Sequence, residues 1–568
     1  MGWATWVVTA AVVALVLGPL AWPGYVLSYD LVFVPRQPLT WESLAPADAL
    51  PRAVPLDMVI SLLNIAIPGW LLERIALAGL LVAAMVGAAR LVPTARTAPR
   101  LVAAVGYGWS PFLAERLLLG QWALLCCYAA LPWLVLAATR LRAGHTDAWP
   151  RLVLAAAAAA LTPTGGVIAV VVTATLLLGR WGGPSGRGSG RTRWGALVAV
   201  GLLNVPWLVA SVVSGAGGRS DPAGVAAFAA RAENWSGVVG ALLGTGGSWN
   251  RWTTPDSRAW TVTPLVTVAL LTLAVAGWPL LRSRLPAGLA GRLAWLAAGG
   301  FVLAGAGATT PGAAALRFLV AHVPGGGLLR DGQKFLIPYV LLLVLAAACG
   351  AERAGAWLTA RAGAQAGGVL LVSAVLLPVL AMPDLAWGGF GALRPVSYPP
   401  EWATVARLVA ASPGQVLVLP FAEYRRYGFN HGRTVIDPWP RYLAAPVLAD
   451  DTLIVDGQAI PGENRRAAAV HAHLAAGGAA AELGVEWVVV VGPGVPASAL
   501  SGLATTFASS ELTLYHNPHP APVPQASTST RMAMIAAYAV ALGCVLAAAV
   551  AALARWRAVA SWRRRARA

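Results

Sequence analysis

Asp30 is the carboxylate best placed for chemistry in this sequence, because it lies just beyond the first apolar run, between aromatic and apolar neighbours. At the edge of a bilayer a carboxylate is partly desolvated, which raises its pKa and suits it to accept a proton. We therefore predict Asp30 as a catalytic base; the alternative is a solvated loop acid or an ion-pair partner of Arg36. Weaker candidates in the same loop are Glu42, Asp48 and Asp57.

A glycine-rich cationic segment spans residues 325–335 and contains Arg330 and Lys334, with His322 close by. Glycines let backbone amides approach an anion, and the two cations supply charge. The segment leads into an apolar run near membrane depth, where the phosphate of a lipid would lie. It predicts a phosphate-binding site made by Arg330, Lys334 and His322; a flexible loop with snorkelling cations is the alternative.

Polar and aromatic side chains follow a short β-branched run at residues 416–419. Ligands of open α/β sheets bind beyond the carboxyl ends of the strands. Aromatic, Arg, Asn and His side chains also suit sugar stacking and hydrogen bonds to hydroxyl groups, so we predict an acceptor-binding surface here. A polar contact between this region and the membrane is the alternative. The predicted residues are Arg426, Asn430, His431 and Arg433.

Several reaction classes are excluded by what the sequence lacks. A P-loop needs Gly-Lys-Ser/Thr, but the only lysine, Lys334, is followed by Phe335. The four cysteines lie in apolar runs, and His471 and His473 would point to different faces of one helix, so no metal ligands are predicted. The apolar runs carry almost no charge at mid-span, which disfavours an ion-coupled transporter.

The elements that must position these side chains are membrane helices. The 568 residues are 58% hydrophobic and 11% charged, with a mean hydropathy of +0.67. Soluble domains carry roughly 25% charged residues, so a single soluble domain is excluded, and so is disorder. Apolar runs of about twenty residues recur along the chain and predict a polytopic α-helical membrane protein with about twelve crossings.

The net charge of +18 reports topology rather than nucleic-acid binding. Arginines gather in alternate connectors and in the tail, whereas nearly all acids lie in the other connectors. Cytoplasmic loops are enriched in Lys and Arg, so the plasma-membrane protein is predicted to have both termini in the cytoplasm. The basic connectors on both sides of the apolar stretch 152–179 require an even number of crossings between them. This stretch is therefore predicted to form two short helices with a turn at residues 162–166. The basic connectors are 90–100, 140–151, 180–193, 282–292 and 353–361.

Three parts of the chain are predicted. Residues 1–384 form a multi-span transmembrane domain with outer loops at 21–57, 214–261 and 307–334. Residues 385–528 form a small extracytoplasmic α/β domain, with buried strands at 416–419 and 488–491, an edge strand at 512–515, and helices at 400–411 and 463–483. Residues 529–568 form the final transmembrane helix and a basic cytoplasmic tail.

This arrangement resembles the GT-C superfamily of membrane glycosyltransferases. The resemblance rests on Asp30 directly after the first helix, on many helices of uneven length, and on an outer domain near the C-terminus. Within the superfamily the chain is most similar to the arabinofuranosyl- and mannosyltransferase-type proteins of actinobacterial envelopes. Such proteins often carry paired acids in the first loop, whereas Asp30 has no acidic neighbour.

The resemblance implies transfer of a sugar from a polyprenyl-phosphate donor to a cell-envelope glycan or lipid acceptor on the extracytoplasmic face. Asp30 would deprotonate the acceptor hydroxyl, and Arg330 and Lys334 would neutralise the departing lipid phosphate. The implied partners are the polyprenyl-phosphate sugar lipid, the acceptor and the membrane; no cofactor is certain, and a divalent cation is left open. Two alternatives remain: a flippase or other transporter of lipid-linked sugars, and a non-catalytic envelope-assembly factor.

Overall fold

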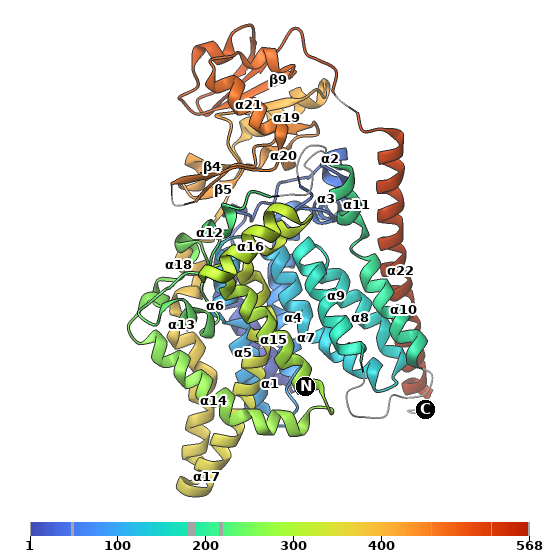
Figure 1. The fold of residues 1–568 in the computed structure, drawn as a ribbon, viewed down its shortest axis with the longest axis vertical. Helices are drawn as coiled ribbons and strands as arrows, with labels where there is room; N and C mark the ends of the chain where they lie inside the picture. Colours follow the sequence, from blue (N-terminus) through green and yellow to red (C-terminus); the bar gives the residue numbers. More distant parts are fainter. Residues whose placement is uncertain are drawn as a thin grey trace.

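The computed structural model describes residues 2–46, 50–179, 189–214, 220–455, 457–523 and 525–565. The candidate Asp48 lies outside these residues, as does most of the basic connector 180–193. A helical part forms the larger share of the molecule, and a smaller α/β region caps one end of it (Figure 1). The chain begins and ends at the opposite end of the helical part (Figure 1).

Eight helices within the described residues are long and apolar enough to cross a membrane, so the protein is a multi-pass membrane protein. Three of these spans include more than one segment: the α1 span continues to Ala21, the α10 span continues through α11, and the α17 span begins at Gly332. The elements are α1 (Trp3–Leu17), α4 (Gly69–Leu91), α7 (Trp122–Arg142), α10 (Ser189–Leu202) with α11 (Val205–Val213), α14 (Thr263–Arg284), α15 (Leu289–Ala306), α17 (Ile337–Ala381) and α22 (Thr528–Arg565).

Helix α17 is two helices joined by a sharp break at Gly363, whose φ of 87° is left-handed. Glycine adopts that conformation without steric cost. The two arms fold back on each other, since Gly355 lies against Leu371 and Gly367 lies against Thr359. A basic connector was expected here at 353–361, and the break at Gly363 lies two residues beyond it.

Shorter helices complete the helical part: α2 (Trp41–Leu44), α3 (Leu56–Ala66), α5 (Thr97–Gly108), α6 (Pro111–Leu118), α8 (Trp149–Ala159), α9 (Pro163–Leu177), α12 (Gly224–Ala227), α13 (Gly237–Leu243), α16 (Thr310–His322) and α18 (Ala386–Gly391). Two short helices are confirmed within 152–179, but the turn between them lies at residues 160–162 rather than 162–166, because Thr162 caps α9 by accepting a hydrogen bond from Gly165 N. Helices α5 and α8 are each less than about 20 Å long, shorter than the ~30 Å hydrocarbon core. Twelve crossings therefore stay a prediction. Helix α16 occupies a segment that was expected to be a loop.

The α/β region is built on a five-stranded sheet with the order β10-β11-β9-β3-β6. Strands β3, β6 and β9 run parallel, β11 is antiparallel to β9, and β10 is antiparallel to β11. The segment expected as an edge strand is β11, which is covered on its outer side by β10. The bounds are β3 (Val416–Leu419), β6 (Val447–Leu448), β9 (Trp487–Val491), β10 (Ala504–Ala508), β11 (Leu512–His516), α19 (Pro400–Ala411), α20 (Trp439–Tyr442) and α21 (Arg465–Ala475).

Two small antiparallel hairpins project from this region toward the helical part. They are β4 (Tyr424–Arg426) with β5 (Thr434–Ile436), and β7 (Leu453–Val455) with β8 (Gln458–Ile460). Figure 1 shows β4 and β5 between the sheet and the upper ends of the membrane helices. The first outer loop is joined to this region by backbone pairing, because β1 (Tyr25–Val26) pairs with β2 (Pro395–Val396).

Candidate active site

The first outer loop presents Asp30 from a tight turn that is held on two sides. On one side Tyr29 N donates to Thr434 O at 2.8 Å, and Ile436 N donates to Tyr29 O at 2.9 Å, so the loop adds to strand β5. On the other side Asp30 N donates to Leu119 O at 3.1 Å, at the turn between α6 and α7. Asp30 is therefore fixed at the junction of the α/β region and the helical part.

The turn between α6 and α7 can approach the first loop this closely only because it contains Gly120. Its φ is +77°, and a Cβ at this position would overlap the backbone of Ser28 and Leu31. Any other residue would both strain the turn and push the loop away.

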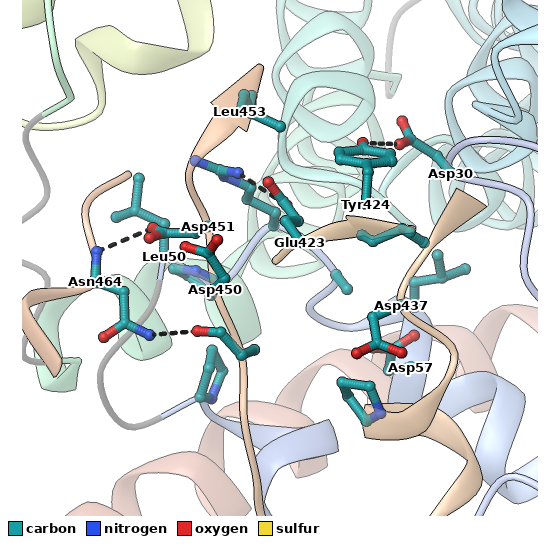
Figure 2. A pocket seen from close by; sticks show the side chains of 18 of the residues that line it. Asp30, Leu50, Asp57, Glu423, Tyr424, Asp437, Asp450, Asp451, Leu453 and Asn464 are labelled. Carbon is teal, nitrogen blue, oxygen red and sulfur yellow. Dashed lines mark hydrogen bonds and ion pairs between the residues drawn. The ribbon is translucent and has the colours of Figure 1, made fainter. Parts of the chain in front are cut away.

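The Asp30 carboxylate accepts two hydrogen bonds. Tyr424 Oη lies 2.5 Å from Oδ1, and Gln121 Nε2 lies 3.2 Å from Oδ2. Figure 2 shows the Tyr424 ring pointing at the Asp30 carboxylate. Both partners are donors, so they fix the carboxylate's orientation, and a carboxylate has lone pairs left to accept a substrate proton.

Asp30 lines a cavity of about 1490 Å³ between the helical part and the α/β region. The predicted phosphate ligands Arg330 and Lys334 line the same cavity. Its wall also includes apolar and aromatic side chains: Trp122, Trp207, Leu208, Val212, Phe228, Trp249, Trp252 and Leu328. A cavity of this size, with both charged and apolar walls, can hold a small polar group attached to a lipid.

The two cations of the 325–335 segment are held by acids. Lys334 Nζ lies 3.5 Å from Asp331 Oδ2, and Arg330 Nη1 lies 3.0 Å from Glu463 Oε1. Arg330 also stacks over the Phe228 ring at 5.1 Å. Burial, with a smaller contribution from Arg52, lowers the pKa of Arg330. Each cation is therefore oriented before any anion arrives.

A buried network connects Lys334 to Asp30. Arg116, with no exposed side-chain surface, forms two hydrogen bonds to Asp331, at 2.8 and 2.9 Å. Arg116 Nη1 also donates to Gln121 Oε1 at 2.7 Å, and Gln121 is the residue that donates to Asp30. Burial alone would raise the pKa of Asp331, but Arg116 and Lys334 lower it to about 2, so this acid stays ionised. The network fixes cation and carboxylate relative to each other.

The other predicted residues divide into one that lines the cavity and four that do not. Arg426 lines it. His322 is exposed at the end of α16, where it stacks on Phe318 and its Nδ1 lies 2.9 Å from Phe318 O. His431 is also exposed and lies outside the cavity.

Asn430 and Arg433 instead hold the first loop. Asn430 is buried and donates to Leu27 O at 2.9 Å. Arg433 Nε donates to Ser28 Oγ at 2.7 Å, and the guanidinium lies over the Tyr29 ring. These contacts give both residues a structural task, which is to position the first loop.

Asp437, after β5, and three acids that follow parallel strands of the α/β region line the cavity and were not among the predicted residues. Glu423 follows strand β3, and Asp450 and Asp451 follow strand β6. Glu423, Asp450 and Asp451 could have been predicted, because they lie beyond the carboxyl ends of parallel strands, where open α/β sheets bind their ligands. Figure 2 shows them on the opposite side of Tyr424 from Asp30. Despite these acids, the described residues include no group of three or more His, Cys, Asp or Glu side chains that could hold a metal ion.

No protein-family model and no curated protein matches the sequence. Solved structures do match: two cryo-EM structures of the mycobacterial arabinofuranosyltransferase AftD, one of them of a mutant, each have a TM-score of 0.57 and 18% identity. They cover 92% and 91% of this chain. The chain spans less than half of the AftD chain, 42% and 40%. A second class of the mutant matches with a TM-score of 0.51.

The chain shares its fold with the arabinofuranosyltransferase AftD. Since the match covers 92% of the chain, it includes most of the helical part and most of the α/β region. The expected resemblance to the GT-C superfamily is thereby confirmed at the level of the fold. At 18% identity a shared fold does not imply a shared reaction, because the reaction depends on the residues that line the cavity.

Proposed function

We propose that the protein is a membrane glycosyltransferase that moves a sugar from a polyprenyl-phosphate donor to a cell-envelope glycan or lipid acceptor on the extracytoplasmic face. The proposal rests on the shared cavity. An oriented carboxylate, Asp30, and two cations, Arg330 and Lys334, line one cavity that also has an apolar wall. A base, a cationic phosphate site and a lipid-compatible surface are what this transfer needs.

In the proposed step the acceptor hydroxyl gives its proton to the Asp30 carboxylate while its oxygen attacks the anomeric carbon of the donor sugar. A new bond forms between that oxygen and the anomeric carbon. The bond from the anomeric carbon to the phosphate oxygen breaks, and the electron pair leaves with the polyprenyl phosphate. Arg330 and Lys334 stabilise the charge on this leaving group, which needs no protonation. No metal is required by this balance.

The experiment uses the purified protein in liposomes, with polyprenyl-phosphate arabinofuranose and polyprenyl-phosphate mannose as radiolabelled donors. Asp30→Asn keeps the size of the side chain and its contacts with Gln121 but removes the base, so kcat should fall by about 10²–10⁴-fold. Asp57→Asn tests the rival acid of the same loop, which is paired with Arg441 at 3.0 Å, and should retain more than a tenth of the activity. Transfer by Asp30→Asn at the wild-type rate would refute the assignment of the base, and absence of transfer by the wild type from both donors would refute the enzymatic proposal.

The face of the membrane is tested by labelling of intact cells with an impermeant maleimide. Single cysteines replace two exposed residues in a background without the four native cysteines: Thr506 in the α/β region and His145 between α7 and α8. We expect Thr506→Cys to react and His145→Cys to react only after the cells are permeabilised. The reverse pattern would overturn the proposed orientation.

A further inference from the structure

The carboxyl ends of the parallel strands of the α/β region face the cavity. Glu423 lies four residues beyond the end of β3, and Asp450 lies two residues beyond the end of β6. Open α/β sheets bind their ligands at this edge, because successive strands diverge there and leave a crevice between their loops. The α/β region thus directs its ligand-binding edge toward the space that also contains Asp30.

The Glu423 carboxyl group has unused hydrogen-bonding capacity. Its side chain is 11% exposed, and Oε2 is buried without a hydrogen-bond partner among the described residues. Oε1 lies 3.8 Å from Arg52 Nη1, beyond hydrogen-bond distance. Arg52 is instead hydrogen-bonded to Glu463. Buried polar atoms are nearly always hydrogen-bonded, so a carboxyl oxygen without a hydrogen-bond partner in a cavity wall is unusual and points to a ligand.

The charges around Glu423 come from several elements. Acids approach it from the first loop (Asp30) and from the loop after β6 (Asp450 and Asp451), whereas the nearest cation is Arg52 of the first outer loop. Arg330 of the 325–335 segment, which shares the partner Glu463 with Arg52, also interacts with Glu423. The hydroxyl group of the adjacent Tyr424 donates its hydrogen bond to Asp30.

Burial is the main cause that raises the pKa of Glu423, and it is raised to about 8. Asp30, Asp451 and Asp450 raise the pKa further, and Arg52 opposes them. At neutral pH Glu423 therefore carries its proton and can donate one hydrogen bond while accepting another, which is the capacity of a group that binds a sugar hydroxyl.

We propose that Glu423 is the acceptor-binding group of the α/β region: its carboxyl group holds a hydroxyl group of the acceptor sugar on the other side of Tyr424 from Asp30 (Figure 2). The inference rests on the proposed function. It relocates acceptor binding from Asn430, His431 and Arg433, which support the first loop or lie outside the cavity, to the strand end that lines it. A sugar bound by Glu423 would have a hydroxyl group directed toward the base, Asp30.

The experiment compares Glu423→Gln with Glu423→Leu in the complete protein, with Glu482→Gln, whose side chain is 65% exposed in the same region, as the matched control. The probes are an octyl arabinofuranosyl disaccharide as acceptor with polyprenyl-phosphate arabinofuranose as donor, and the corresponding mannosyl pair. Gln has a donor and an acceptor like the protonated acid, so kcat/KM for the acceptor should stay within about threefold of wild type at pH 6.5. Leu has neither, so KM for the acceptor should rise at least about tenfold while KM for the donor changes less than about twofold.

The pH profile separates this role from a merely structural one. The wild type should lose kcat/KM for the acceptor as pH rises through about 8, since Glu423 then ionises. Gln cannot ionise, so at pH 9 the wild type should have fallen about tenfold further than Glu423→Gln. An acceptor KM that is unchanged in Glu423→Leu, equal losses for donor and acceptor, or the same alkaline fall in Glu423→Gln would each overturn the inference.

Failure of the proposed function gives a different result. If the wild type transfers no sugar from either donor, the proposed reaction is refuted, and the acceptor's dissociation constants for wild type and Glu423→Leu, measured by native mass spectrometry, still decide whether Glu423 binds the glycan. Equal dissociation constants would overturn the inference on their own.

Discussion

Replacement of Arg116 by Met should be among the most destabilising single changes in the molecule. Arg116 and Asp331 are 0% and 7% exposed as side chains, and two hydrogen bonds of 2.8 and 2.9 Å join them. Arg116 also donates to Gln333 and Gln121 at 2.8 and 2.7 Å. Met fills most of the volume but leaves the buried Asp331 carboxylate with only Lys334, at 3.5 Å, as a cationic partner; loss of one member of a buried ion pair costs about 3–5 kcal/mol. Two amide oxygens lose their donors as well, so the upper part of this range is expected.

The measurement is thermal and denaturant unfolding of detergent-purified protein, followed by the fluorescence of its 25 tryptophans. Arg407→Met, an exposed arginine on α19, is the control and should change the free energy of unfolding by no more than about 0.5 kcal/mol. Removal of both charges in Arg116→Met with Asp331→Leu should recover part of the loss, because the buried carboxylate is gone and Lys334, which loses its 3.5 Å contact with Asp331, has a side chain that is 26% exposed to water. If Arg116→Met costs no more than Arg407→Met, or if the double variant is less stable than the single one, the reasoning about this pair is wrong.

Three further outcomes follow from the same contacts. Gly120→Ala should destabilise the protein by at least about 2 kcal/mol, because its Cβ would overlap the first-loop backbone, whereas Gly477→Ala, with a φ of +81° but open space around it, should cost about 1 kcal/mol in the same unfolding assay. Tyr424→Phe removes one hydrogen bond to Asp30 and should lower kcat by about tenfold with the donor KM unchanged; an unchanged kcat would contradict the role of this contact. The pKa of Asp331 is lowered to about 2, so its stabilisation of about 2 kcal/mol is complete above pH 4 and lost as pH falls toward 2; Asp331→Asn should flatten that part of the stability profile.

The sequence predicted those features that depend on local pattern. The β-branched runs became β3 and β9, and the helix expected at 400–411 is α19 with the same bounds. Asp30, Arg330 and Lys334 were found from residue type and from position next to an apolar run, and all three line the cavity. Local chemistry and hydrophobic periodicity are written into a short window of residues, so they can be recognised without knowledge of the fold.

Features that depend on distant pairing were not predictable in this way. Arg116 and Asp331 are 215 residues apart in sequence, and no local pattern marks them as partners. His322 is near Arg330 in sequence but ends on an exposed helix end, because α16 forms where a loop was expected. Asn430 and Arg433 had side chains suited to sugars, but the same hydrogen-bonding groups bind the first loop.

The α/β region is part of the candidate site rather than an appendage to it. The first loop pairs with β2 and β5, and Tyr424, Asn430 and Arg433 all bind that loop. The carboxylate orientation therefore depends on both parts of the protein, one supplying Tyr424 and the other supplying Gln121. A rigid placement of this kind is needed when a base must meet a hydroxyl within hydrogen-bond distance, because a misplacement of about 1 Å can cost 10²-fold in rate. Movement of the α/β region relative to the helices would break the contact of Asp30 with either Tyr424 or Gln121, and would therefore misplace the base relative to both the acceptor and the cations.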